Sequence, residues 1–269
     1  MKKKKFKIRH IIQLIFFAFI ALSAVNHNLE NAGKAIPVLS ALSLDTICPF
    51  GGVVSLYQLA TVGTLVKKVH ESALVVLGLV MVLAVLFGPV FCGWICPLGS
   101  VQEWFGRIGK KLFGKKYNTF MNSKVDHSLR YTRYAVLAWV LYMTARSGQL
   151  LFQTIDPYYA LFNFWTGGVA IAGLLVLTGT LVLSLFIERP WCKYACPFGA
   201  AIGVFNLVSV FKIRRNPVTC TSCSICDRSC PMNINVSKKN KVVNHQCIRC
   251  MECTSENKCP VVDTVEIKL

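Results

Sequence analysis

Eight cysteines near the C-terminus have the types and spacing of ligands for metal clusters. They form two runs of Cys-x2-Cys-x2-Cys, each followed by a further Cys-Pro. Three thiolates two residues apart can wrap one iron–sulfur cubane, and in two-cluster ferredoxins the fourth cysteine of a run ligates the other cluster. We therefore predict two [4Fe–4S] clusters with crossed fourth ligands. The first cluster takes Cys220, Cys223, Cys226 and Cys259, and the second takes Cys247, Cys250, Cys253 and Cys230.

Zinc is the main alternative for these runs, because zinc sites also use CxxC pairs. Zinc usually takes two separated pairs, whereas a triplet with a trailing Cys-Pro occurs here twice and favours cubanes. The second run departs from the usual pattern, with five residues instead of three before Cys259. His245, two residues before Cys247, is interpreted as a solvated loop histidine rather than a group that tunes a cluster.

Two more cysteine pairs share a different motif, Cys-x3-Cys-Pro. They are Cys92 with Cys96 before Pro97, and Cys192 with Cys196 before Pro197. Proline favours the first turn of a helix, so Cys96 and Cys196 are predicted at helix N-termini, where thiolate or an anionic cluster is stabilised. Two hypotheses stay open: an additional redox metal site built by the four cysteines, or two structural turns with buried thiols.

The second cysteine of each pair also belongs to an internal repeat of the form Cys-Pro-[Phe/Leu]-Gly. A third copy begins at Cys48, inside a short apolar segment at 48–66 that could be re-entrant or interfacial. Cys48 has no second cysteine nearby, so we expect a structural role in the repeat in preference to contact with a quinone or a partner.

The composition of the chain indicates a membrane protein. Of 269 residues, 54% are hydrophobic and only 16% charged, with a mean hydropathy of +0.51. Four apolar spans at about 10–27, 72–91, 135–152 and 167–187 approach the ~20 residues that cross a bilayer. The predicted fold is mainly α: a transmembrane domain over 1–211, then a small α+β domain over 212–269 of the bacterial two-[4Fe–4S] ferredoxin type. The first span could instead be a signal peptide ending near Ala24.

Basic residues set the predicted orientation. They cluster before the first span and between residues 106 and 133, whereas the loop at 153–166 has no Lys or Arg. The net charge of +18 therefore indicates cytoplasmic loops and contact with lipid, with no nucleic-acid partner. We expect both termini and the ferredoxin domain on the cytoplasmic side of a bacterial or archaeal membrane, where disulfides are disfavoured. Residues 198–211 are predicted to lie along the inner membrane surface.

No nucleotide-binding, haem-attachment or hydrolytic motif is present in the sequence. If the protein exchanges electrons with a membrane pool, a quinone is the expected carrier. The polar candidates for its site are Arg146 near the outer end of the third span and Asp156-Pro157-Tyr158 beyond it. For Arg146, snorkelling to the outer interface is the preferred interpretation, and Asp156-Pro157 could only start a turn.

The motifs FCGWICPLG and WCKYACPFG, together with four spans and the two C-terminal runs, resemble the membrane polyferredoxins of the NapH/MauN type. These are related to the C-terminal part of NosR, although the sequence shows no periplasmic flavin-binding domain of the long NosR type. The resemblance covers nearly the whole chain. It implies electron transfer between the quinol pool and another redox protein, such as a cytochrome, ferredoxin or reductase. Whether such a subunit counts as a quinol dehydrogenase, an enzyme in its own right, stays open.

One alternative belongs to a different functional class. The same clusters could serve a maturation factor that reduces a metal or cysteine on a client enzyme. A membrane redox sensor is a third reading, but the sequence contains no signalling domain.

Overall fold

The computed structural model describes residues 3–31, 71–147, 151–164, 169–255, 258–261 and 263–268. Cys48 and the predicted segment at 48–66 lie outside the described residues. The side chains of residues 3–7, 27–31 and 71–75 are also outside the description.

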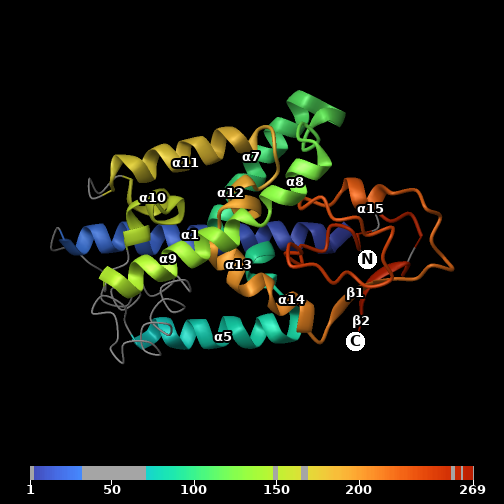
Figure 1. The fold of residues 1–269 in the computed structure, drawn as a ribbon, viewed down its shortest axis with the longest axis horizontal. Helices are drawn as coiled ribbons and strands as arrows, with labels where there is room; N and C mark the ends of the chain where they lie inside the picture. The colour runs from blue at the N-terminus through green and yellow to red at the C-terminus, as the bar shows by residue number, and fades with distance from the viewer. Residues whose placement is uncertain are drawn as a thin grey trace.

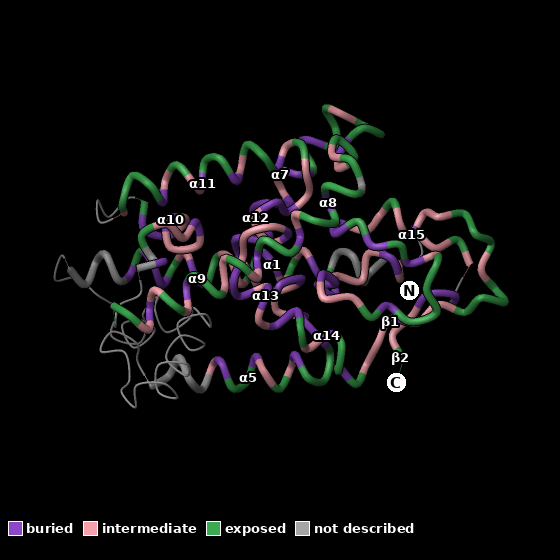
Figure 2. Tube along the Cα trace, in the orientation of Figure 1, coloured by how far each residue is buried: buried purple, intermediate pink, exposed green. Residues whose placement is uncertain are grey.

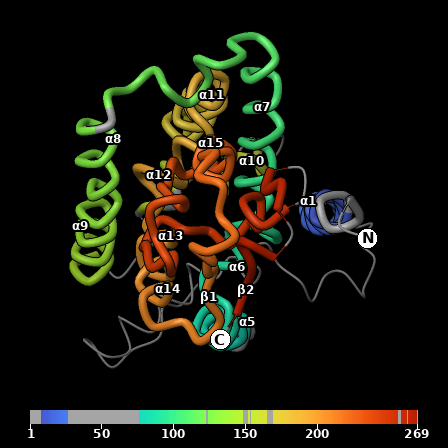
Figure 3. The backbone as a smooth tube through the Cα atoms, turned by 90° about the vertical axis from the view of Figure 1, so that its right-hand side faces the viewer, coloured from blue at the N-terminus to red at the C-terminus, as the bar shows by residue number. Residues whose placement is uncertain are grey.

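Four long helices overlap the four predicted spans. They are α1 (Lys3–Asn31), α5 (Glu71–Phe87), α9 (Thr132–Ser147) and α11 (Ile171–Ser184). All four run along the long axis of the molecule, with α1 and α9 directed away from the C-terminal unit and α5 and α11 directed back to it (Figure 1). The view along this axis shows α1, α5, α9 and α11 on four sides, with the C-terminal unit over their common end (Figure 3).

Among the described residues, one helix is long and apolar enough to cross a membrane, over Ile8–Asn26 in α1. The 17 residues of α5, the 16 of α9 and the 14 of α11 fall below the length of about 20 residues that a full crossing needs. Their outer faces are nevertheless exposed and apolar (Figure 2), with 62% of Leu79 and 68% of Leu175 accessible. Large exposed apolar faces are unusual on a soluble monomer.

Each Cys-x3-Cys-Pro motif forms a short helix, a turn and a second helix headed by proline. The first copy gives α6 (Val90–Trp94) and α7 (Pro97–Phe113), and the second gives α12 (Pro190–Tyr194) and α13 (Pro197–Gly203). Cys96 and Cys196 are the residues that cap α7 and α13. The predicted position of these cysteines before a proline-headed helix is confirmed.

The segment predicted to lie on the inner membrane surface is divided between the interior and the surface of the protein. It forms α13 and the short α14 (Phe205–Val208), and α13 packs against α9. Phe198 and Ile202 are buried, and a Cβ on Gly203 would lie 2.9 Å from the Arg133 guanidinium. The prediction of a surface helix is therefore wrong for α13, because apolar composition alone does not distinguish lipid contact from contact with protein. Beyond α13, Val204, Leu207 and Val208 expose 45–67% of their surface.

The loop expected outside the membrane folds back between the helices. Residues Leu151–Thr154 form the turn η2, and Pro157–Asn163 form α10, which packs on α11, α1 and α7. Asp156 caps α10 by accepting a hydrogen bond from the Tyr158 amide at 3.1 Å, and Ala160 and Phe162 are buried. Because α7 follows Cys96 directly, this return brings Asp156 and Tyr158 toward the cysteine pairs.

The C-terminal unit is closed by a two-stranded antiparallel sheet. Strand β1 (Lys212–Arg215) pairs with β2 (Val265–Lys268), with Ile213 opposite Ile267, and α15 (Ile225–Arg228) lies between them in sequence. One hydrophobic cluster joins Ile213 and Met232 of this unit to Val140 and Ile202 of the helices. The unit is therefore packed onto the helical part. Between α7 and α9 the chain forms η1 (Gly114–Lys116) and α8 (Ser123–Leu129).

Candidate metal centres

Four of the eight C-terminal cysteines surround one small cavity of about 20 Å³. Its walls include Cys230 from the first run and the three closely spaced cysteines of the second run, Cys247, Cys250 and Cys253. Burial raises the pKa of the Cys253 thiol, and the neighbouring sulfurs of Cys250, Cys230 and Cys247 raise it further. The structure thus brings together the four residues assigned to the second cluster, including the ligand that crosses from the other run.

The four C-terminal cysteines assigned to the first cluster lie nearer the surface of the protein. Cys223 is exposed, Cys220 and Cys259 are half-buried, and Cys226 is buried. The loop that carries them belongs to the end of the molecule where α15 lies, away from the far ends of the long helices (Figure 1). The Cys226 sulfur is close enough to Cys253 to raise the pKa of that thiol, so the two cysteine groups adjoin each other.

The two runs share an unusual backbone geometry. The residues just before and just after the middle cysteine have positive φ: Ser222 and Ser224 in the first run, Arg249 and Met251 in the second. Non-glycine residues rarely adopt this conformation, and it is found where a functional site requires it. Both loops therefore hold the same strained shape with different side chains, as expected if both must wrap the same kind of group.

The four cysteines of the Cys-x3-Cys-Pro motifs also meet. Cys92, Cys96, Cys192 and Cys196 all line a second cavity of about 60 Å³, whose other walls include Phe152, Trp191 and Phe198. Within the described ranges, no three His, Cys, Asp or Glu side chains are close enough to hold a single metal ion.

Hydrogen-bond donors point at two of these sulfurs. The Gly199 amide donates to Cys196 Sγ at 3.2 Å, and Gln102 Nε2 donates to Cys192 Sγ at 3.6 Å. Arg133 lines the same cavity, is 2% exposed, and its Nε has no hydrogen-bond partner among the described atoms. These donors favour negative charge on the sulfurs.

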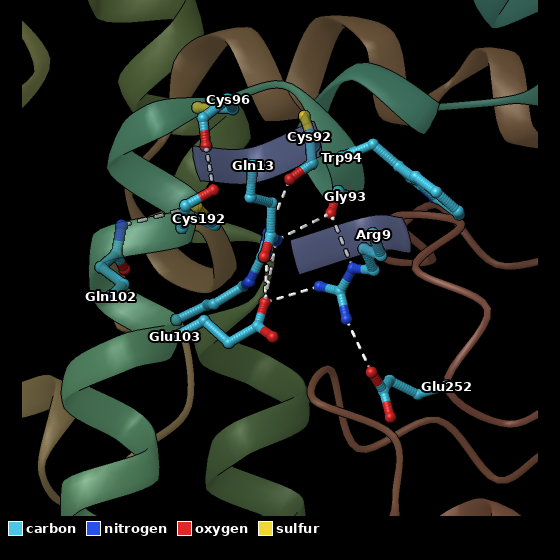
Figure 4. A network of polar contacts seen from close by, with 12 residues as sticks. Arg9, Gln13, Cys92, Gly93, Trp94, Cys96, Gln102, Glu103, Cys192 and Glu252 are labelled. Atoms are coloured by element: carbon cyan, nitrogen blue, oxygen red, sulfur yellow. Dashed lines mark hydrogen bonds and ion pairs between the residues drawn. The ribbon is translucent and has the colours of Figure 1, made fainter. Parts of the chain in front are cut away.

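A buried ionic network surrounds the first Cys-x3-Cys turn (Figure 4). Glu103 of α7 accepts from Arg9 of α1 at 2.5 Å and from Arg189 at 2.7 Å. Burial alone would raise the pKa of Glu103, but Arg189, Arg9 and Arg107 outweigh burial and lower the pKa to about 2. The same guanidinium groups hold the turn, because Arg9 donates to the Gly93 carbonyl and Arg189 to the Cys92 carbonyl.

This turn is in direct contact with a cluster-binding loop. Trp94 Nε1 donates to the Arg249 carbonyl at 2.9 Å. A Cβ added to Gly93 would collide with the Ile248 carbonyl and lie 3.3 Å from Cys250 Cα. Arg9 also pairs with Glu252 at 2.7 Å, and Cys247 and Ile248 line the cavity of the four motif cysteines. The turn of the first motif therefore packs directly on the second cysteine run.

The polar residues considered for a quinone site fall into two places. Asp156 and Tyr158 line the cavity of the four motif cysteines, and burial raises the pKa of Asp156 to about 7. Arg146 is exposed, with its guanidinium stacked 5.6 Å from the Tyr142 ring centre. The structure therefore joins Asp156 and Tyr158 to the cysteines and leaves Arg146 apart from them.

His245 is not a solvated loop residue, so that interpretation was wrong. Its Nδ1 lies 3.0 Å from the Tyr134 hydroxyl, its ring contacts Tyr131, and it lines the cavity of the motif cysteines. Burial, together with Arg133 and Arg130, lowers the pKa of His245 to about 4. The imidazole is therefore neutral at physiological pH.

Comparison with known proteins agrees with this geometry. A family described as a 4Fe-4S binding domain matches the chain twice, at residues 69–116 and 169–216, and each match contains one Cys-x3-Cys-Pro pair. The protein of Escherichia coli (strain K12) named "Putative electron transport protein YccM" is 33% identical over 246 residues, 89% of this chain and 68% of that protein. The ferredoxin-type protein NapH of Haemophilus influenzae is 30% identical over 225 residues, 79% and 74% of the two chains.

The chain belongs to the NapH-type ferredoxin family. Its members are electron-transport iron–sulfur proteins, and the family is related to the regulatory protein NosR. NosR of Pseudomonas aeruginosa is 25% identical over 184 residues, 64% of this chain and 24% of that protein. No solved structure matches the chain significantly.

Sequence reasoning missed the residues that hold this NapH-type site together. Arg9 was interpreted only as a topogenic charge, and Glu103, Gln102 and Arg189 were not singled out. A signal was available, since the chain has only 12 acidic residues and Glu103 lies between Val101-Gln102 and Trp104-Phe105, in a mostly apolar stretch. An ionisable group in such surroundings is a functional candidate whose partner has to be found elsewhere in the chain.

Proposed function

We propose that this protein carries electrons from membrane quinol to a partner redox protein through two [4Fe–4S] clusters. The family match establishes electron transport by an iron–sulfur protein. The observation that supports the rest of the proposal is the position of the two cysteine runs. One lies against the Cys-x3-Cys turn between α6 and α7, and the other contains the exposed Cys223.

The order of the clusters follows from these positions. The cavity formed by Cys230, Cys247, Cys250 and Cys253 would hold the cluster nearer the membrane. The site of Cys220, Cys223, Cys226 and Cys259 would hold the outer cluster, where a soluble partner can approach the exposed thiolate loop. An electron from the membrane would then cross the C-terminal unit before it reaches the partner.

The residues fit iron–sulfur clusters better than zinc. Both loops repeat the same left-handed positions around the middle cysteine, and Cys230 crosses to the opposite run, as the ferredoxin pattern requires. The clusters would supply one-electron redox chemistry. The protein's own contribution is to hold the thiolates, exclude water from the inner site and present the outer one.

Membrane insertion through four helices is part of the proposal. The antiparallel order of α1, α5, α9 and α11, and the apolar side chains exposed on each, support four crossings in a bacterial or archaeal cytoplasmic membrane. Both termini lie at the same end of the molecule. We place this end of the molecule in the cytoplasm, because the basic residues cluster before the first span and between residues 106 and 133.

Asp156 is the group proposed to receive a proton from quinol. Oxidation of a quinol releases two electrons and two protons, and the clusters take up electrons only. A carboxyl with a pKa of about 7 beside the electron entry point is suited to accept protons at physiological pH. The 60 Å³ cavity is smaller than the ~300–1,000 Å³ of small-molecule pockets, so the quinol would approach from the lipid, next to Asp156 and Tyr158.

The test uses the full chain, purified without oxygen and reconstituted into liposomes. A reduced quinone analogue should reduce the clusters, as seen by EPR or by loss of visible absorbance, and Asp156→Asn should slow this step without changing reduction by dithionite. Dithionite-reducible clusters that quinol never reduces would refute the quinol proposal. If a client enzyme also loses its metal in a deletion strain, the maturation role becomes the better account.

A further inference from the structure

We propose that Cys92, Cys96, Cys192 and Cys196 together bind a third iron–sulfur cluster, shared by the two halves of the helical domain. Each half contributes one Cys-x3-Cys-Pro pair, and two thiolates do not complete the usual set of four ligands. The structure places both pairs around one cavity. The site exists only when the halves are packed together.

The cavity suits a compact inorganic group. It encloses about 60 Å³ between the four cysteines and the aromatic side chains of Phe152, Trp191 and Phe198. A single tetrahedral zinc would need its four sulfurs about 3.8 Å apart, at about 2.3 Å from the metal, and a count of iron and zinc per chain distinguishes it from a cluster. A cluster binds each thiolate to the outside of a larger core.

The charges around the cavity match an anionic cluster. Four thiolates leave iron–sulfur clusters with net negative charge, and burial of that charge requires hydrogen bonds or cations nearby. The Gly199 amide and Gln102 donate to the sulfurs of Cys196 and Cys192. The buried Arg133 lines the cavity with its Nε free of any described partner.

Buried ionic contacts and paired turns support the framework around the site. Arg189 is completely buried, donates to the Cys92 carbonyl at 2.6 Å and pairs with Glu103. Two turns of equal length, α6 to α7 and α12 to α13, present their cysteines to the same space. Ligands of a metal site need this kind of outer support to keep their geometry.

The position of the site indicates its role. Cys247 and Ile248 of the inner ferredoxin loop line the same cavity, and Gly93 packs directly on that loop. Quinol would give up its two electrons to the shared site one at a time and leave as quinone, with its two protons passing by way of Asp156 to water. After each electron arrives, its transfer to the cluster at Cys247 would return the shared site to the oxidised state, with no proton needed in this second transfer. This relay role rests on the proposed function, whereas the existence of the site does not.

The test is a count of iron and acid-labile sulfide per chain in protein purified without oxygen. Two cubanes account for about 8 iron atoms, and a third cluster raises the count to about 10 or about 12, depending on whether it is [2Fe–2S] or [4Fe–4S]. Either higher value in the wild type supports the proposal. A wild-type value of about 8, or about 8 with one zinc, overturns it even if every variant misfolds.

The test variant carries Cys96→Ser and Cys196→Ser together. The control is Cys48→Ser, which makes the same chemical change at the one cysteine outside the two C-terminal runs and the two Cys-x3-Cys-Pro pairs. The double variant should lose the extra iron and keep the EPR signals of the two ferredoxin clusters, which report correct folding. Cys48→Ser should keep all the iron. Extra iron that persists in a folded double variant also refutes the proposed ligands. These outcomes do not depend on quinol, so they separate this inference from the proposed function.

Discussion

Replacement of Glu103 by Gln tests the role of the buried ionic network most directly. The change keeps the size of the side chain and removes the carboxylate that Arg9 and Arg189 share. Both guanidinium groups are buried, at 2% and 0% exposed, so they would lose their common counter-charge without gaining water. Arg9 keeps its pair with Glu252, whereas Arg189 has no other ion pair among the described residues.

Two estimates of the cost agree. The pKa of Glu103 falls from the ordinary 4.5 to about 2, and at about 1.4 kcal/mol per pKa unit this corresponds to about 3 kcal/mol. Removal of one partner from a buried ion pair costs about 3–5 kcal/mol in other proteins. Because the folded-state pKa is depressed, this stabilisation is complete above about pH 4.5 and is lost as the pH falls toward 2.

The assay compares thermal unfolding in one detergent at one scan rate, near pH 7. Glu266→Gln is the control, because Glu266 pairs with Lys268 at the surface, where an ion pair contributes at most about 1 kcal/mol. Glu103→Gln should lower the midpoint by several degrees and Glu266→Gln by little. Equal behaviour of the two variants would refute the claim that the network stabilises the cysteine turn.

Three further predictions address the site. In the wild type, the quinol-dependent rate should increase as the pH rises through about 7, because the Asp156 carboxyl accepts a proton only when it is ionised. Asp156→Asn should abolish this increase, and an unchanged pH profile would exclude Asp156 as the proton acceptor. Cys223→Ser should block electron transfer to an external acceptor but leave the inner cluster reducible by quinol, as followed by EPR. Cys250→Ser should block both the reduction of the inner cluster and the transfer to the acceptor, and the reverse pattern would invert the proposed cluster order. Gly93→Ala should weaken docking of the ferredoxin unit and raise the protease sensitivity of the C-terminal unit, because the new Cβ would collide with the Ile248 carbonyl. Gly179→Ala in α11 is the control, since open space surrounds Gly179, and it should leave that sensitivity unchanged.

The sequence alone was enough to identify the chemistry of this protein. Cysteine spacing is a local property, so the two runs and the two Cys-x3-Cys-Pro pairs could be recognised without any fold. Local rules also placed Cys96 and Cys196 before proline-headed helices, because capping depends on a few neighbouring residues. Apolar runs located the four long helices, although only α1 has the full length and composition of a crossing among the described residues.

Only the tertiary structure decided which local motifs share a site. Sequence distance gives no information on the approach of Cys92 to Cys192, or of Asp156 to both, because each depends on how helices pack. The ion pairs of Glu103 join residues 94 and 86 positions away, and α13, in the predicted surface helix at 198–211, packs on α9 in the interior for the same reason. Contacts between distant segments arise from the packing of side chains on whole elements, and periodicity or spacing along the chain carries no record of them.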